Sequence, residues 1–344
     1  MKVVVLGSFV PLLRSRSSEL LCNLVKNLRL AGIQAEGFRI PFTSDPAEQL
    51  VEEMTIVRRI RLSNLDRAIA LNFPAYLVCW PNKVLWLTHQ HREAYDLRDA
   101  GKSNIGTDVR GRQLVEAIRT SDRLAFFESR KVYTLASITA RRLMEYNEVS
   151  SSILHPPLNN PELFWNDDSN GYVFAPGKVS VGHRQHLLIR ALRHVPRVRL
   201  VIAGPADTEN ADRLQRIVAE ENVADRVTLD LRHLARSDLA RFVNSCLAVA
   251  WLPSQDDPLG IRYIPEAFEA AKPVLTATDA KEVLEFVRHG ETGVVTQPHP
   301  EALSHGVATL ADNPAMAVRL GRAGYDLIRL AGLSWPATIK RLTD

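Results

Sequence analysis

The chain has 344 residues, of which 46% are hydrophobic and 24% are charged, and its formal net charge is +4. This composition indicates a globular protein, and the length favours two domains. No apolar run approaches a membrane span, and the three cysteines follow no disulfide or zinc spacing, which favours a reducing cytosol. The mild positive charge suits an anionic ligand or an anionic membrane surface, and we expect no nucleic-acid partner.

The first half alternates short apolar runs with amphipathic segments, a pattern that predicts parallel strands joined by helices. Residues 2–6 predict a buried strand near the start of the chain, where no signal peptide is expected. A helix ending at Gly32 and a strand over residues 34–40 complete a βαβ unit. Further predicted elements are a helix over 46–60, strands over 66–71 and 83–88, a helix to about 120, a strand over 124–128, a long helix over 131–146 and a strand over 150–154. The linker that follows sets the first domain at residues 1–157.

The predicted helix over residues 46–60 ends in a basic cluster, Arg58-Arg59-Ile-Arg61. Cations at a helix C-terminus interact favourably with the macrodipole and need no ligand. The same cluster also suits an anionic membrane or a lipid-linked acceptor. Both interpretations remain open.

Two histidines, His89 and His91, follow the predicted strand over residues 83–88. Sites form at the carboxyl ends of parallel strands, so both rings are candidates to bind a ligand. Packing is the alternative. A metal is not expected, because the two side chains alternate across an extended segment and no third ligand is indicated.

The second half repeats the strand and helix alternation. Its predicted strands cover residues 172–176, 199–204, 226–231, 247–252, 274–278 and 294–296. Its predicted helices cover 185–193, 208–221, 237–245, a short helix between Pro265 and Pro273, 281–289, 300–311 and 314–330. This gives a second domain at residues 158–330, followed by a C-terminal helix within 331–344.

Loops after the strands of residues 247–297 are rich in acids and contain a glycine. Acids accept hydrogen bonds from sugar and ribose hydroxyls, and backbone N–H groups near a glycine or a helix start suit a diphosphate. A nucleotide-sugar needs both. The candidate residues are Asp256, Asp257, Gly260, Arg262, Glu266, Asp279 and Glu282.

In order and spacing, this region resembles the family 4 (group 1) retaining glycosyltransferases. The segments that carry the resemblance are Asp257-Pro-Leu-Gly260, Pro265-Glu-Ala-Phe268, Lys272-Pro-Val274, Glu282-Val-Leu-Glu-Phe-Val287 and Gly290-Glu-Thr-Gly293. The resemblance implies an α/β protein of the GT-B fold, with two Rossmann-like parallel-sheet domains facing a central cleft. It implies that the first domain lies on the acceptor side, that the second binds a nucleotide-sugar, and that the final helix crosses back to the first domain, with Trp335 as an anchor.

The resemblance also implies roles for single residues. The family carries an Arg and a Lys in the loop after the first strand of the second domain, where this chain has Lys178 and His183, with Arg184 beside the latter. Lys178 is then expected to neutralise the departing diphosphate unless it is merely solvated, and the choice between His183 and Arg184 stays open. Other implied roles are ribose binding by Glu266, contact with the donor sugar by Asp257 or Asp256, diphosphate contact near Gly260, and a sugar or acceptor contact by His89.

The function implied is transfer of a sugar from a UDP- or GDP-linked donor to a glycan, lipid-linked or small-molecule acceptor, with retention and without a metal or other cofactor. The alternative is a non-catalytic GT-B scaffold that binds a nucleotide or a partner protein; an epimerase on the same scaffold is weaker. Three departures from the family support the alternative: residues 14–18 replace a Gly-Gly pair, His183 replaces Lys, and eight residues rather than seven separate Asp257 from Glu266. The sequence does not indicate an oligomeric state.

Overall fold

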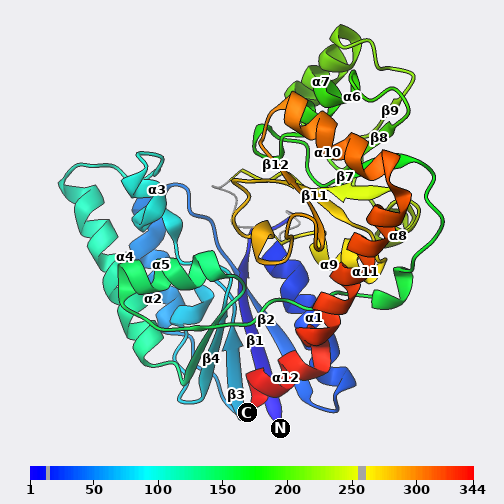
Figure 1. The fold of residues 1–344 in the computed structure, drawn as a ribbon. Helices are drawn as coiled ribbons and strands as arrows, with labels where there is room; N and C mark the ends of the chain where they lie inside the picture. The colour runs from blue at the N-terminus through cyan, green and yellow to red at the C-terminus, as the bar shows by residue number, and fades with distance from the viewer. Residues whose placement is uncertain (13–15, 255–260) are drawn as a thin grey trace. The chain divides into compact units, whose positions relative to one another are not determined.

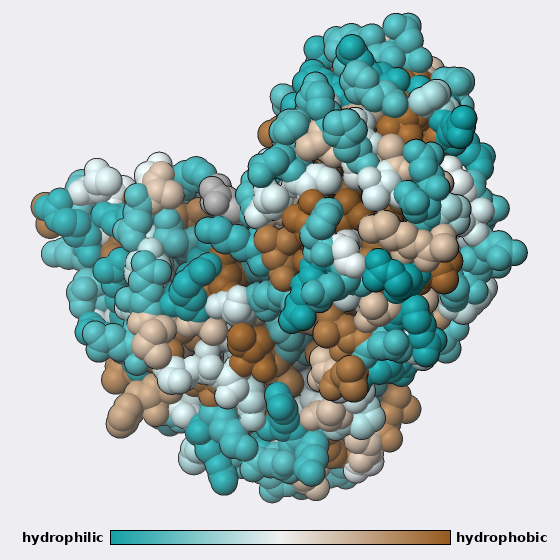
Figure 2. Space-filling model, in the orientation of Figure 1, coloured by the Kyte–Doolittle hydropathy of each residue, from teal (hydrophilic) through white to brown (hydrophobic). Residues whose placement is uncertain are grey.

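The computed structural model describes residues 1–12, 16–254 and 261–344. The chain divides into two compact units, residues Met1–Pro157 with Ser334–Asp344, and residues Leu158–Leu333. In the described residues each unit is built on one six-stranded sheet (Figure 1). Hydrophilic residues cover most of the face shown in Figure 2, and apolar residues form smaller patches on it. Over the described ranges, no helix combines the length and the apolar character that a membrane crossing requires.

The sheet of the first unit has the order β2-β1-β3-β4-β5-β6, and its neighbouring strands pair in parallel. Along β1, Val3 and Val5 enter one apolar core while Val4 and Leu6 enter another. This alternation is expected of a strand covered on both faces. The strands are β1 (Lys2–Phe9), β2 (Gln34–Pro41), β3 (Arg67–Ala70), β4 (Lys83–Leu87), β5 (Lys131–Thr134) and β6 (Ser152–Ile153).

Helices cover both faces of this first sheet. They are α1 (Arg16–Leu30), α2 (Leu50–Arg58), α3 (Asp96–Asp99), α4 (Val109–Phe127), α5 (Ser137–Asn147) and α12 (Trp335–Thr343). Short 3-10 turns lie at Ala47–Gln49, Ala75–Leu77 and Arg92–Ala94. α1 and α12 share the core of Val3 and Val5, whereas α2 and α4 share that of Val4 and Leu6. Trp335 packs edge-on against Trp86 with ring centroids 6.2 Å apart, which joins the last helix to this unit.

The sheet of the second unit has the order β12-β11-β10-β7-β8-β9, again with parallel neighbours. Its strands are β7 (Tyr172–Pro176), β8 (Arg199–Ala203), β9 (Val227–Asp230), β10 (Ala248–Ala250), β11 (Val274–Ala277) and β12 (Gly293–Thr296). Its helices are α6 (Gln185–Leu192), α7 (Thr208–Glu220), α8 (Arg236–Asn244), α9 (Ile264–Glu269), α10 (Pro300–Asp312) and α11 (Pro314–Leu330), with 3-10 turns at Pro161–Leu163, Val181–His183 and Val283–Glu285. α6, α7 and α10 cover one face, and α8 and α9 cover the other.

Two elements predicted in the first unit are wrong. Residues 124–128 are the end of α4 rather than a strand, and the helix predicted over 131–146 is β5 followed by α5. In α4, Ala125 and Phe126 are buried while Leu124 and Phe127 are 51% and 91% exposed. A short apolar run carries no periodicity that separates a strand from the last turns of an amphipathic helix.

The helix predicted over residues 281–289 is also wrong, because the structure has only the turn Val283–Glu285 there. Its backbone hydrogen bonds mix three-residue spans, as from Val283 N to Ala280 O, with four-residue spans, as from Val287 N to Val283 O. Val283 and Val287 are buried against the core of α8 and α9, so the segment follows the tertiary packing rather than helical periodicity.

Candidate functional site

The loop after β7 fixes the backbone of Lys178 and leaves its side chain exposed. The carbonyl oxygen of Lys178 accepts a hydrogen bond from Gln185 Nε2 over 3.1 Å and lies 2.6 Å from His183 Nδ1. A carbonyl can only accept, so Nδ1 of His183 carries the proton. Ser180 Oγ accepts from the His183 backbone N–H over 3.2 Å, which closes the turn. An exposed ammonium group therefore projects from a hydrogen-bonded loop.

Arg184 follows in the same loop but is bound to a carboxylate. Its Nη1 and Nη2 donate to Oδ1 and Oδ2 of Asp279 over 2.8 and 2.6 Å. This hydrogen bonding lowers the pKa of Asp279 below its usual range. Arg184 adopts a left-handed backbone with φ of 58° where the turn Val181–His183 meets α6. Both terminal nitrogens of the guanidinium thus bind the loop that follows β11.

Glu266, predicted as the ribose ligand, lies in the first turn of α9 and is 8% exposed. Its Oε1 accepts a hydrogen bond from Arg236 Nη1 over 2.8 Å. Arg236 also donates from Nη2 to the Asn159 carbonyl over 2.8 Å and lies over the Phe164 ring, 4.7 Å from its centroid. These contacts fix the guanidinium, and the guanidinium in turn orients one oxygen of the carboxylate.

Two aromatic rings join the start of α9 to the β7 loop. Gly177 has φ of +103°, and a Cβ there would lie 3.0 Å from Tyr263 and 3.1 Å from Trp251. The Tyr263 and Trp251 rings meet edge-on with centroids 5.0 Å apart. Arg262, another predicted ligand, lies over the Tyr263 ring at 5.2 Å. Only glycine fits at position 177, both sterically and by its backbone conformation.

Three predicted ligands, Asp256, Asp257 and Gly260, lie outside the described residues. Glu282 is described and is 5% exposed. In the parts of the chain that the structure describes, no three His, Cys, Asp or Glu side chains gather as a metal site would require.

In the first unit, His89 and His91 follow β4 but lie in different environments. His89 is partly buried, its Nδ1 lies 2.7 Å from the Gln90 carbonyl, and burial lowers its pKa. His91 is 7% exposed and packs on Phe73 with ring centroids 4.6 Å apart. Burial, with a contribution from His89, lowers the pKa of His91 to about 4, so this ring is neutral near pH 7. Of the two, His89 is the more accessible.

A buried polar network, which the sequence did not reveal, lies beneath these histidines. Gln90 donates to Asn147 over 2.9 Å, and Asn147 donates to the Tyr95 hydroxyl over 3.0 Å. Tyr95 and Tyr76 then donate to the two carboxylate oxygens of Asp122 over 2.9 and 2.8 Å. Burial raises the pKa of Asp122 to about 7, although both tyrosine hydrogen bonds lower it. The network ties the histidine loop to α4 and α5.

Residues 161–327 match the family model described as glycosyl transferases group 1. The second unit is a group 1 glycosyltransferase domain.

A human enzyme aligns with part of this chain. Alpha-1,3/1,6-mannosyltransferase ALG2 of Homo sapiens is 28% identical over 134 residues, covering 37% of this chain and 31% of the human protein. The alignment therefore spans about a third of that relative.

The fold of the glycosyltransferase domain and of the first unit is found in solved structures. Sucrose-phosphate synthase from Thermosynechococcus elongatus matches 99% of this chain and 97% of its own, with a TM-score of 0.74 and 16% identity. HepE from Anabaena, in complex with UDP and glucose, matches 99% and 98%, with a TM-score of 0.69 and 14% identity. At such identities the likeness concerns the fold alone. The GT-B fold predicted from the sequence, with two Rossmann-like parallel sheets, is confirmed.

Within the glycosyltransferase domain, the sequence predicted Lys178, His183, Arg184 and Glu266 as site residues, and the structure shows which contacts each of them makes. Sequence patterns did not predict Arg236, the partner of Glu266, and they gave no role to Asp279, the partner of Arg184. Arg236 starts α8 after β9 and belongs to no recognisable motif. Asp279 appeared only as one of several loop acids, because the contact that pairs it with Arg184 joins residues 95 positions apart.

Proposed function

We propose that this chain is a retaining, metal-independent glycosyltransferase. Its donor is a UDP- or GDP-linked sugar, and its acceptor is a glycan, a lipid-linked glycan or a small molecule. The observation that carries the proposal is the pair of opposite charges that the group 1 domain presents: the exposed ammonium of Lys178 on a fixed loop, and the Glu266 carboxylate oriented by Arg236.

The proposed roles follow from the charge that develops during transfer. Breaking the bond between the sugar and the diphosphate leaves negative charge on the departing group, which Lys178 and His183 stabilise. Glu266 accepts hydrogen bonds from the ribose hydroxyls. Asp256 or Asp257 holds the hydroxyls of the donor sugar, and His89 in the first unit serves the acceptor.

The comparisons support the donor class. The Anabaena relative of the same fold is in complex with UDP and glucose, and the human relative is a mannosyltransferase. Retention follows from the resemblance to the family rather than from any distance in the structure.

Substitution of Glu266 tests the proposal. We expect the wild-type chain to be stabilised thermally by UDP or GDP and to hydrolyse or transfer a sugar from the matching donor. Glu266→Gln should lower transfer by about a hundredfold, because an amide is a weaker acceptor for ribose hydroxyls. The matched control is Glu291→Gln, which changes an exposed acid paired with Arg288 and should leave transfer unchanged.

A non-catalytic scaffold is the competing outcome. Such a protein would be stabilised by nucleotide but would release no sugar from any donor in a panel of UDP-, GDP-, dTDP- and ADP-linked sugars. That result would overturn the proposed activity while retaining the nucleotide site.

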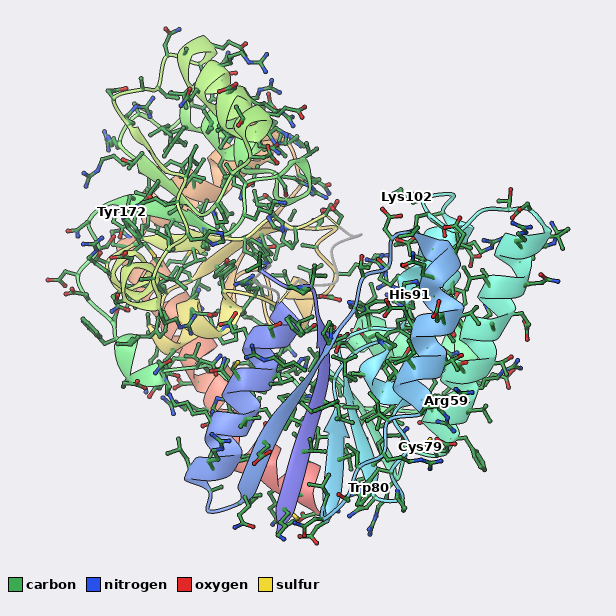
Figure 3. All side chains as sticks on the ribbon, turned by 180° about the vertical axis from the view of Figure 1, so that it is seen from behind. Arg59, Cys79, Trp80, His91, Lys102 and Tyr172 are labelled. Carbon is green, nitrogen blue, oxygen red and sulfur yellow. The ribbon has the colours of Figure 1, made fainter. Side chains whose placement is uncertain are left out.

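For its location we propose the cytoplasm, with peripheral attachment to an anionic membrane face. An ion pair between Arg58 and Glu128 joins the C-terminal ends of α2 and α4. Arg59 and Arg61, which follow α2, are exposed, and the Phe127 side chain at the end of α4 is 91% exposed. Figure 3 shows Arg59 on the same side of the first unit as Cys79, away from His91. Exposed cations beside an exposed aromatic ring suit an anionic lipid surface.

Vesicle cosedimentation tests this attachment. The chain should bind vesicles of phosphatidylglycerol and phosphatidylcholine more strongly than vesicles of phosphatidylcholine alone, and salt should weaken the binding. Phe127→Ser with Arg59→Gln should abolish it. Equal binding to both vesicle types, or none, would contradict the attachment.

A further inference from the structure

We propose that Asp279 is a positioning residue that acts through Arg184 to set the place of Lys178. In this interpretation Arg184 does not bind the diphosphate; its charge is committed to holding two loops together. The inference rests on the proposed function, since it concerns how the same site meets a nucleoside diphosphate.

The ion pair connects two segments that leave the carboxyl edge of one sheet. Arg184 lies in the loop after β7, and Asp279 follows β11. In the sheet, β10 lies between these two strands. Two parallel hydrogen bonds of 2.8 and 2.6 Å join the guanidinium of Arg184 to the carboxylate of Asp279. The Arg184 side chain is only 14% exposed. Such a bidentate pair fixes orientation as well as distance.

The residues on either side of Arg184 transmit this anchor to Lys178. His183 Nδ1 and Gln185 Nε2 converge on the carbonyl oxygen of Lys178 at 2.6 and 3.1 Å. Gln185 is 2% exposed, so its amide cannot move without disturbing the core. A shift of Arg184 would therefore move both donors, and with them the backbone from which the Lys178 ammonium projects.

The backbone of Arg184 points to the same role. Its φ of 58° lies in the left-handed region, which a residue with a side chain seldom adopts. An arginine is retained in this conformation by contacts that offset the strain, and the ion pair with Asp279 is such a contact. A glycine would take this conformation without strain but would leave the two loops unjoined.

A test by calorimetry can use UDP and GDP as probes and compare wild type with Lys178→Ala, Asp279→Asn, and both together. We expect each single change to weaken nucleotide binding roughly tenfold. The double variant should be no more than about twofold weaker than either single variant, because Lys178 is already displaced when Asp279 is lost. The salt dependence of binding should fall equally in all three variants, because one ionic contact is lost in each.

The sign of the effect separates positioning from simple electrostatics. Asp279→Asn removes a negative charge near the loop, so the field alone would tighten binding of an anionic nucleotide. Tighter binding would show that Asp279 competes with phosphate for Arg184 and would overturn the inference. So would a double variant whose losses multiply to about a hundredfold. The charge-matched control is Asp326→Asn on α11, where the exposed carboxylate pairs with Arg322; its affinity should equal that of wild type.

Arg184→Gly provides a second approach if Asp279→Asn does not fold. Glycine suits the left-handed position, so this variant should fold and yet bind nucleotide as weakly as Asp279→Asn. If Arg184→Gly binds nucleotide with wild-type affinity, the inference is overturned and the proposed function is not affected. A wild-type chain that binds neither UDP nor GDP would instead defeat the proposed function, and the inference with it.

Discussion

Arg236 donates a hydrogen bond from Nη1 to Oε1 of Glu266 over 2.8 Å, while its second terminal nitrogen is held by the Asn159 carbonyl. Glu266 is 8% exposed, so its carboxylate depends on this partner for a hydrogen bond. The acid expected to bind ribose is therefore already oriented without a ligand. The free energy of nucleotide binding is then not reduced by the entropy loss of ordering this side chain.

Arg236→Ala should destabilise the chain by roughly 3 kcal/mol, because it leaves a buried carboxylate unpaired. It should also weaken UDP or GDP binding. Urea unfolding and calorimetry would measure the two effects. Arg241→Ala, on the same helix and paired with Asp238 at the surface, should cost no more than about 0.5 kcal/mol. Equal losses in the two variants would contradict the orienting role of Arg236.

Asp122 should make stability fall as pH rises. Its pKa is raised to about 7 in the folded chain, and an unfolded aspartate has a pKa of about 3.9. Between these values the folded state holds a proton that the unfolded state has lost, so the free energy of unfolding declines, by roughly 4 kcal/mol in total. Below the window both states are protonated, and above it both are ionised.

Asp122→Asn tests this, since the amide is close in shape and does not titrate. Urea unfolding at pH 5 and pH 7 should show a smaller decline with pH for the variant than for wild type. Asp312→Asn, with no pairing role in the described contacts, serves as the control for a changed net charge. If the free energy of unfolding depends on pH in the same way for Asp122→Asn and wild type, then the titration of Asp122 does not contribute to the pH dependence of stability.

The two histidines after β4 should separate in function. We expect His89→Ala to lower transfer by about a hundredfold, because the accessible ring serves the acceptor as a hydrogen-bonding or proton-transfer group. His91→Phe should retain most of the activity, because this ring is neutral, buried and stacked on Phe73. Steady-state kinetics with the identified donor would measure both, and the reverse order would reassign the site.

Trp335 should contribute to the stability of the first unit. It is 9% exposed and packs against Trp86 in the core formed by α1 and α12. Trp335→Ala should cost about 3 kcal/mol, as for other large-to-small changes in a core. Trp165→Ala removes a ring that is 56% exposed and should cost much less. Comparable losses in urea unfolding would show that the last helix is not anchored by Trp335.

The sequence by itself determined the alternation of strands and helices, the parallel sheets and the group 1 segments, because these depend on local patterns. Apolar periodicity located β1, and spaced motifs around Glu266 identified the family. The resemblance to the family also singled out Lys178, in the loop after the first predicted strand of the second domain, as a candidate phosphate contact.

Only the tertiary structure decided which charges are available. Arg184 and Lys178 are both basic residues of the same loop. The structure pairs the guanidinium of Arg184 with Asp279, whereas the ammonium group of Lys178 is exposed. The end of α4 was likewise misjudged, because core contacts rather than composition set its length. Pairing and burial depend on residues distant in the chain, and these determine which of several similar side chains can meet a ligand.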